Sequence, residues 1–207
     1  IHITTLLSTL FRLFSPPLRR PLFLFFLLVG GAILCDPFFD SYASTWRLGK
    51  YAGFPSALVS PPLMLVSSAL LFGISLIRGF RTTRLLILAL SLLIADGAGR
   101  LLKIVVGRLR PVYSGEWSSF SPLTFNPAYH SLPSGHAIGA FALATSLSLF
   151  FPKWKKVWYL FGSACAFSRV LLGHHYVSDV VCGALLGMGV ARYVHKKIEQ
   201  ARGLLDS

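Results

Sequence analysis

The sequence predicts an all-α fold: a bundle of six transmembrane helices with a short helix at its N-terminal end. Two observations carry this prediction. The 207 residues are 54% hydrophobic and only 13% charged, and the mean hydropathy is +0.66, which is too apolar for an ordinary soluble domain. Apolar stretches of about 20 residues, the length that crosses a bilayer as a helix, alternate with short polar turns.

The chain begins with an amphipathic stretch. Over residues 1–15 the apolar side chains recur at helical spacing, with Thr, Ser and Arg between them, a pattern typical of a helix lying in the membrane interface. Pro16 and Pro17 end this helix. No basic segment precedes an apolar run in this stretch, so we expect no signal peptide.

Six long apolar stretches follow. Arg19 and Arg20 mark the water boundary before the first, and the segment 40–54 between the first two is rich in Tyr, Trp and basic residues, as interfacial segments are. The expected spans are residues 21–39, 55–77, 85–106, 136–151, 157–172 and 175–194. The predicted organisation is therefore an interfacial helix at 1–20, a six-span unit at 21–194 and a cytoplasmic tail at 195–207.

Two further features of the spans are informative. The sixth is rich in small residues, which allow helices to pack closely in membranes; they are Gly183, Ala184, Gly187, Gly189 and Ala191. Between the third and fourth spans lies a loop at 107–132, too long for a simple connector. We expect this loop to form a lid or a rim for a substrate.

The charge distribution predicts the orientation. The net charge is +13, yet the basic residues are scattered between apolar spans rather than gathered on one face, which argues against a nucleic-acid partner. Thirteen of the twenty Lys and Arg residues fall at the termini or in the even-numbered turns. The positive-inside rule makes that side, with both termini, cytoplasmic. We therefore expect a multi-pass protein of the cytoplasmic membrane.

The three cysteines give no sign of a metal site. Cys35, Cys165 and Cys182 lie in or beside apolar segments without metal-ligand spacing. We expect them to act as small buried hydrophobes.

A polar stretch at 168–179 interrupts this apolar background. If the segment after Gly173 is helical, His175 and Asp179 lie four residues apart on one face, and the carboxylate can accept a hydrogen bond from one imidazole nitrogen. The other nitrogen is then free to attack an electrophile, with the ring held in the required tautomer.

Threading the six spans brings the remaining polar groups to the same side. The end of span three, the start of span four, the end of span five and the start of span six all open on the extracytoplasmic face. The residues that can meet there are Lys103, Arg110, His136, Arg169, His175 and Asp179. Three cations around two histidines suit a phosphate group.

The start of span four adds an anion-binding element. Ser134 and Gly135 precede the span directly, so a hydroxyl and backbone N–H groups can face an anion near the positive end of the helix dipole.

These residues form three motifs in order: Lys103-x6-Arg110-Pro111, Pro133-Ser134-Gly135-His136 and Ser168-Arg169-x5-His175-x3-Asp179. The set resembles the three-part signature of the type 2 phosphatidic acid phosphatase (PAP2) family, which also includes vanadium haloperoxidases and acid phosphatases. The six-span layout is similar to that of the family's membrane branch.

The resemblance implies a catalytic group of three residues. His175 would be the nucleophile and form a phosphohistidine, Asp179 would orient it, and His136 would protonate the leaving alkoxide and then activate water.

The resemblance also implies a phosphate-binding group. Its members would be Lys103, Arg110, Ser134, the Gly135 N–H and Arg169. The scheme needs no cofactor and no metal, and the sequence offers no carboxylate cluster for magnesium.

The function implied is a membrane lipid phosphatase. For a compact, bacterial-looking member the resemblance leaves four substrates open: phosphatidylglycerol phosphate, undecaprenyl diphosphate, the 1-phosphate of lipid A, and phosphatidate. Phosphotransfer to a lipid hydroxyl, an anion transporter, a non-catalytic lipid-binding protein and a vanadate-dependent oxidase are the alternatives. The oligomeric state stays open.

Four other polar residues are interpreted as supporting ones. Asp96 and Arg100, four apart, are expected to form a structural pair. His174 is expected to line the site or to hydrogen-bond with Ser178. Arg108 either contacts an anionic head group or lies in water.

Overall fold

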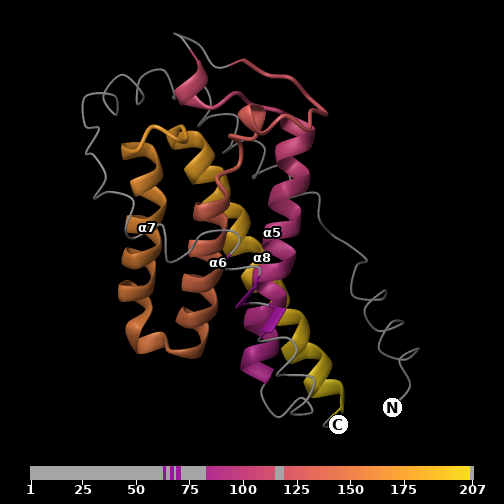
Figure 1. Ribbon diagram of the computed structural model, residues 1–207. Helices are drawn as coiled ribbons and strands as arrows, with labels where there is room; N and C mark the ends of the chain where they lie inside the picture. The colour runs from indigo at the N-terminus through magenta and orange to yellow at the C-terminus, as the bar shows by residue number, and fades with distance from the viewer. Residues whose placement is uncertain (1–62, 64–65, 68, 71–82, 115–118, 206–207) are drawn as a thin grey trace.

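A computed structural model describes residues 63, 66–67, 69–70, 83–114 and 119–205. Four helices make up most of this part of the chain: α5 (Thr83–Val106), α6 (Gly135–Phe150), α7 (Lys155–Leu171) and α8 (Val177–Leu205), shown in Figure 1. Three short 3-10 helices lie between them: η2 (Pro111–Tyr113), η3 (Pro127–Tyr129) and η4 (Pro152–Trp154). The described residues contain no β-strand, so the all-α prediction is confirmed for them.

The elements predicted for the N-terminal part of the chain lie largely outside the described residues. The interfacial helix at 1–20 and the first span at 21–39 fall there entirely, and the second span at 55–77 falls there for the most part. The total of six spans and the N-terminal helix therefore stay predictions.

The last four predicted spans each correspond to a helix. α5 and residues 177–203 of α8 are long and apolar enough to cross a membrane, whereas α6 is apolar but shorter. The main difference concerns the sixth span, which was predicted to begin at His175 and end at Val194. The helix begins at Val177, two residues beyond the histidine, and continues to Leu205, so no break in secondary structure marks the start of the predicted tail.

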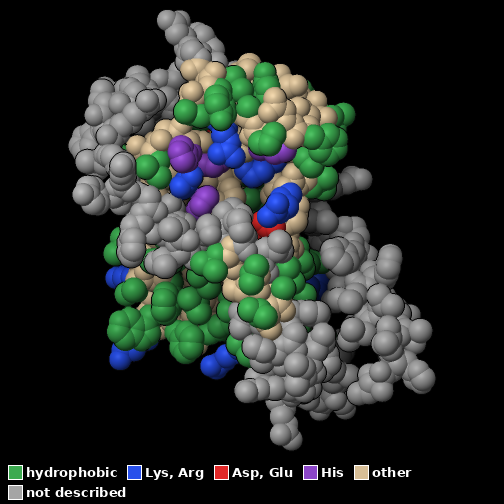
Figure 2. All heavy atoms as spheres, viewed as in Figure 1, with side chains coloured by type: hydrophobic (Ala, Val, Ile, Leu, Met, Phe, Trp, Pro, Cys, Tyr) green, Lys and Arg blue, Asp and Glu red, His purple; other side chains and the backbone are tan. Residues whose placement is uncertain are grey.

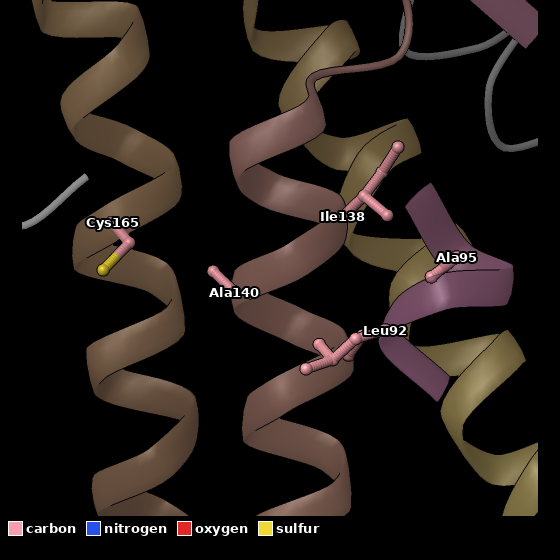
Figure 3. Packing of buried hydrophobic residues seen from close by; sticks show 6 residues of the cluster. Leu92, Ala95, Ile138, Ala140 and Cys165 are labelled. Carbon is pink, nitrogen blue, oxygen red and sulfur yellow. The ribbon is translucent and has the colours of Figure 1, made fainter. Parts of the chain in front are cut away.

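α6 is the central helix of the described bundle and packs against α5, α7 and α8. Its inward positions carry small side chains such as Ala140 and Ala142, which let the neighbouring helices approach. They form a buried cluster with Leu92 and Ala95 of α5 and Cys165 of α7, and Ile138 of α6 completes it (Figure 3).

The predicted close packing of the sixth span holds for two of its glycines. A Cβ on Gly183 would stand 2.6 Å from the carbonyl oxygen of Ser134, and one on Gly187 would stand 2.2 Å from that of Ile138. Gly189 differs, because a Cβ there would meet no atom of the described residues within 4 Å. Gly189 lies outside the α6–α8 contact, and close packing at this glycine stays a prediction.

Two glycines in the left-handed conformation end the helices that lead into the polar region. Gly107 (φ 59°) follows α5 and donates to the carbonyl of Lys103, and Gly173 (φ 67°) follows α7 and donates to that of Val170. The chain therefore turns sharply after each helix, and the ends of α5 and α7 lie beside the starts of α6 and α8 (Figure 1).

The cysteines behave as predicted where they are described. Cys165 and Cys182 are both buried and both free, whereas Cys35 lies outside the described residues.

Candidate active site

A cavity of about 350 Å³ opens where these helix ends meet. The cations predicted to bind phosphate and both predicted catalytic histidines line it; the lining residues are Asp96, Gly99, Arg100, Lys103, Ile104, Arg110, Pro127, His130, Gly135, His136, Ile138, Arg169 and His175. In Figure 2, Lys, Arg and His side chains gather in a hollow between the loops and the apolar sides of the helices. The convergence predicted by threading the spans is therefore present.

His175 lies in the turn before α8, not within the helix, where the sequence pattern predicts it. Its Nδ1 is nevertheless 3.4 Å from Oδ2 of Asp179, longer than a normal hydrogen bond. Both side chains are buried. The pairing arises because the turn folds the ring back over the first turn of the helix.

Asp179 also caps α8. Its Oδ2 accepts from the backbone N–H of Tyr176 at 3.0 Å, which is the reciprocal half of a capping box, with an acidic residue at the third helical position reaching back to the cap. The same oxygen accepts from the hydroxyl of Ser131 at 2.5 Å. The carboxylate is thus fixed by helix formation itself and by the long loop.

Arg108 holds the other oxygen of this carboxylate. Its Nη1 donates to Asp179 Oδ1 at 2.9 Å and to the hydroxyl of Ser178 at 2.6 Å, and only 1% of the residue is exposed. Both readings offered by the sequence, a head-group contact or a solvated side chain, are wrong. The sequence signal was weak, since a basic residue in a Gly-Arg-Leu-Arg loop resembles any solvated loop arginine.

The cations line the cavity from three parts of the chain. Lys103 comes from the last turn of α5, and its Nζ donates to the carbonyl of His130 at 2.8 Å. Arg110 is the N-cap of η2, and its backbone N–H donates to the carbonyl of Ala128. Arg169, in the last turn of α7, contacts Nδ1 of His174 through its Nη2.

Ser134 is placed differently from its neighbours. It is the N-cap of α6 and is fully buried, it does not line the cavity, and its hydroxyl has no hydrogen-bond partner among the described residues. Gly135 and His136 follow it at the start of α6 and do line the cavity. The first turn of α6 therefore presents its N-terminal end to the cavity, as anion sites at helix starts do.

The predicted structural pair is also present. Nε of Arg100 donates to Oδ2 of Asp96 at 2.6 Å, so the two charges offset each other on the cavity side of α5.

Two histidines, His174 and His175, lie in the turn before α8, outside the helices. Burial lowers the pKa of His175 to about 4; Asp179 opposes this shift, while Lys103 and Arg110 reinforce it. The pKa of His174 is lowered as well, first by burial and then by Arg169 and Arg110. Both rings are therefore neutral at pH 7, the state in which an imidazole nitrogen can act as a nucleophile.

The charge pattern favours an anionic ligand. Among the described residues, no group of three or more His, Cys, Asp or Glu side chains could hold a metal ion. The cavity instead offers three cations, a helix start and a neutral imidazole backed by a carboxylate, a combination suited to transfer of a phosphoryl group.

Comparison with known proteins agrees with this chemistry. A lipid A 1-phosphatase from Rhizobium etli is 34% identical over 89 residues, which cover 42% of this chain and 38% of that protein. An undecaprenyl-diphosphatase from Sulfolobus acidocaldarius is 33% identical over 108 residues, 50% of each chain. This chain thus spans half or less of the length of these relatives.

A solved structure shares the arrangement of helices. The crystal structure of a transmembrane PAP2-type phosphatidylglycerolphosphate phosphatase from Bacillus subtilis superposes with a TM-score of 0.57 at 25% identity, over 87% of this chain and 95% of that one. Residues 84–202, which include every predicted site residue, match the sequence model of the PAP2 superfamily. The family resemblance inferred from the three motifs is confirmed, and the chain belongs to the PAP2 superfamily.

Proposed function

We propose that this membrane protein is a lipid phosphatase that works through a phosphohistidine on His175. The observation that carries the proposal is the cavity itself, in which Lys103, Arg110 and Arg169 surround two histidines, with a buried carboxylate behind one of them. The two relatives and the solved structure described above carry names of phosphatases of lipid phosphates or diphosphates, which supports the same chemistry.

In the first step, Nε2 of neutral His175 attacks the phosphorus of the substrate, and the bond from phosphorus to the leaving oxygen breaks. The Nδ1 proton faces Asp179, whose negative charge stabilises the charge that develops on the ring. The 3.4 Å contact is expected to shorten as this charge grows, as catalytic hydrogen bonds often tighten only when substrate is bound. His136 acts as the acid: the negative charge of the bound phosphate favours a proton on its ring, and this proton passes to the leaving oxygen.

In the second step, His136, now neutral, takes a proton from water while the water oxygen attacks the phosphohistidine. The P–N bond breaks, inorganic phosphate leaves, and His175 returns to its neutral state. Each histidine ends the cycle as it began, so the reaction is a hydrolysis without a net change in the protein.

The remaining groups bind the phosphoryl oxygens. Lys103, Arg110 and Arg169 offset their negative charge, and the Gly135 N–H at the start of α6 donates to one oxygen. The hydroxyl of Ser134, which has no hydrogen-bond partner in the described part of the chain, would gain one if the first turn of α6 adjusts toward a bound phosphate.

The substrate is proposed to be a lipid because the cavity lies at the ends of apolar helices long enough to span a membrane. Phosphatidylglycerol phosphate, undecaprenyl diphosphate, lipid A 1-phosphate and phosphatidate are the candidates. The site faces the extracytoplasmic side of the cytoplasmic membrane, and both termini face the cytoplasm. The six-span unit at 21–194 is the proposed phosphatase domain, between the interfacial helix and the tail.

The test is release of inorganic phosphate from these four lipids in detergent with a metal chelator. Wild-type protein, His175→Ala and Arg202→Gln are compared; Arg202 is exposed and lies near the far end of α8, where its Nη1 is 4.0 Å from Oε1 of Glu199. We expect release in the wild type and in Arg202→Gln and none in His175→Ala. Absence of release from every lipid in the wild type, or full release in His175→Ala, would contradict the proposal.

A further inference from the structure

Arg108 and Ser131 form the two halves of a clamp on the buried carboxylate of Asp179. Arg108 donates to Oδ1 and Ser131 donates to Oδ2. The backbone N–H of Ser131 also donates to the carbonyl of Arg108 at 3.0 Å. The residues at the two ends of the 107–132 loop are therefore joined to each other and hold one carboxylate oxygen each.

Burial makes this arrangement energetically significant. An arginine is always charged, and removing it from water costs several kcal/mol unless an anion and further hydrogen bonds compensate. Asp179, with 0% exposure, supplies the anion. The hydroxyl of Ser178 and the ring of Tyr176, whose centre lies 3.8 Å from the guanidinium carbon, supply the rest.

The clamp also determines what the carboxylate can do for His175. Oδ1 is occupied by Arg108, so Oδ2 is the oxygen that faces the ring. Because the cation offsets most of the carboxylate charge, the pair attracts a proton to the ring less strongly than a lone carboxylate would. His175 can therefore stay neutral beside a carboxylate and still be oriented by it.

We propose that Arg108, together with Ser131, is a positioning residue for phosphoryl transfer: it fixes the plane of the Asp179 carboxylate and limits its charge, so that His175 is oriented and ready to attack. This inference rests on the proposed function, because it assigns Arg108 a role only if His175 is the nucleophile. Arg108 is not among the residues that line the cavity, so the proposed role is exerted through Asp179. The same contacts give the 107–132 loop a role as a support for the nucleophile.

The first test compares steady-state kinetics of wild type, Arg108→Gln, Arg108→Lys and the surface control Arg202→Gln. We expect kcat of Arg108→Gln to fall about 10- to 100-fold, as is typical when a group that orients a functional side chain is lost, with KM unchanged. Arg108→Lys keeps the charge and should recover part of the loss. Arg202→Gln should match the wild type.

The second test is the pH profile, which a purely structural role would not move. His175 is faced by Lys103 of α5, Arg110 of the loop, His136 of α6 and Asp179 of α8. Without Arg108 the negative charge of the Asp179 carboxylate is no longer offset, so it favours protonation of the His175 ring. The acid limb of kcat/KM in Arg108→Gln should therefore move to higher pH, by about 1 to 3 units.

A double-mutant cycle with Asp179→Asn identifies the route of the effect. If Arg108 acts through Asp179, adding Arg108→Gln to Asp179→Asn should lower kcat no further. If Arg108→Gln does not yield folded protein, Ser131→Ala carries the test, because it frees Oδ2 and should lower kcat and shift the acid limb in the same direction.

The outcomes separate this inference from the proposed function. An inactive His175→Ala beside an Arg108→Gln variant with the kcat and pH profile of the wild type would overturn the inference alone, as would multiplicative losses in the double mutant. If Arg108→Gln does not yield folded protein, a Ser131→Ala variant with the kcat and pH profile of the wild type would overturn the inference in the same way. A fully active His175→Ala would overturn the proposed function itself.

Discussion

The backbone N–H of Ser134, at the start of α6, donates to the backbone carbonyl of Asp179, in the first turn of α8, at 2.9 Å. This bond joins the turn that presents helix N–H groups to the cavity with the residue that orients His175. The motif around Ser134 and the motif that ends at Asp179 are therefore parts of one rigid joint between α6 and α8. The joint depends on Gly183, which lies one turn further along α8 and leaves room for the Ser134 carbonyl.

Gly183→Ala is expected to separate the two helices at this joint. The new methyl group would stand 2.6 Å from the carbonyl oxygen of Ser134 and 3.0 Å from Cβ of Ala137, and overpacking of this kind typically costs about 1–3 kcal/mol. We expect a lower unfolding temperature in detergent and a lower kcat. The matched control is Gly189→Ala, whose methyl group meets none of the residues that the structure describes within 4 Å and which should gain about 0.5–1 kcal/mol of helix propensity. Equal unfolding temperatures and equal kcat values in Gly183→Ala and Gly189→Ala would contradict the tight contact between α6 and α8 at Gly183.

His175 is expected to remain neutral well below the usual histidine range. Burial lowers its pKa to about 4, so the ring gains its proton only as the pH falls toward 4. An unfolded chain, with a pKa near 6.5, binds this proton first, so the site loses stability as the pH falls from about 6.5 to 4. An NMR titration of protein labelled with ¹⁵N-histidine, assigned with His175→Gln, measures the midpoint. A midpoint at or above 6.5 would contradict the burial argument.

Lys103→Met is expected to weaken binding of phosphate analogues. The ammonium group lines the cavity and is held in place by the carbonyl of His130, and a hydrogen bond to a charged group contributes about 1.5–3 kcal/mol. The inhibition constant of orthovanadate should therefore rise about 10- to 150-fold. Lys153→Met, at the exposed turn before α7, is the matched control and should not change it. An unchanged constant in Lys103→Met would exclude the lysine from the anion site.

The sequence allowed much of this site to be predicted, for physical reasons. Apolar stretches of membrane-spanning length show which segments form helices. Because successive spans cross the membrane in opposite directions, the chain order determines which helix ends lie on the same side, and this alone brings Lys103, Arg169 and His175 together. The boundaries were less accurate at the turn before α8. There the left-handed Gly173 and the capping contact of Asp179 delay the helix until Val177, which periodicity does not reveal.

The role of Arg108 could not be predicted from local pattern. Its burial depends on the loop returning at Ser131 and on the first turn of α8, both far away in sequence. The one local signal was its position directly after Gly107, whose left-handed conformation turns the chain back over the helix ends. Similarly, nothing in the sequence around Ser134 indicated that its hydroxyl would be buried without a partner among the residues that the structure describes.

The orientation in the membrane is testable because the two ends of the bundle carry exposed residues suited to labelling. Phe125 lies in the loop over the cavity end and is 78% exposed, and Lys153 lies in the exposed turn between α6 and α7. In a variant whose three native cysteines are Ala, we expect Phe125→Cys to react with a membrane-impermeant maleimide in intact cells. Lys153→Cys should react only after permeabilisation. The reason is the cluster of lysines at the α6–α7 turn, which the positive-inside rule retains in the cytoplasm. The reverse pattern would place the cavity on the cytoplasmic side, and the lipid phosphates within its reach would then be those of the inner leaflet.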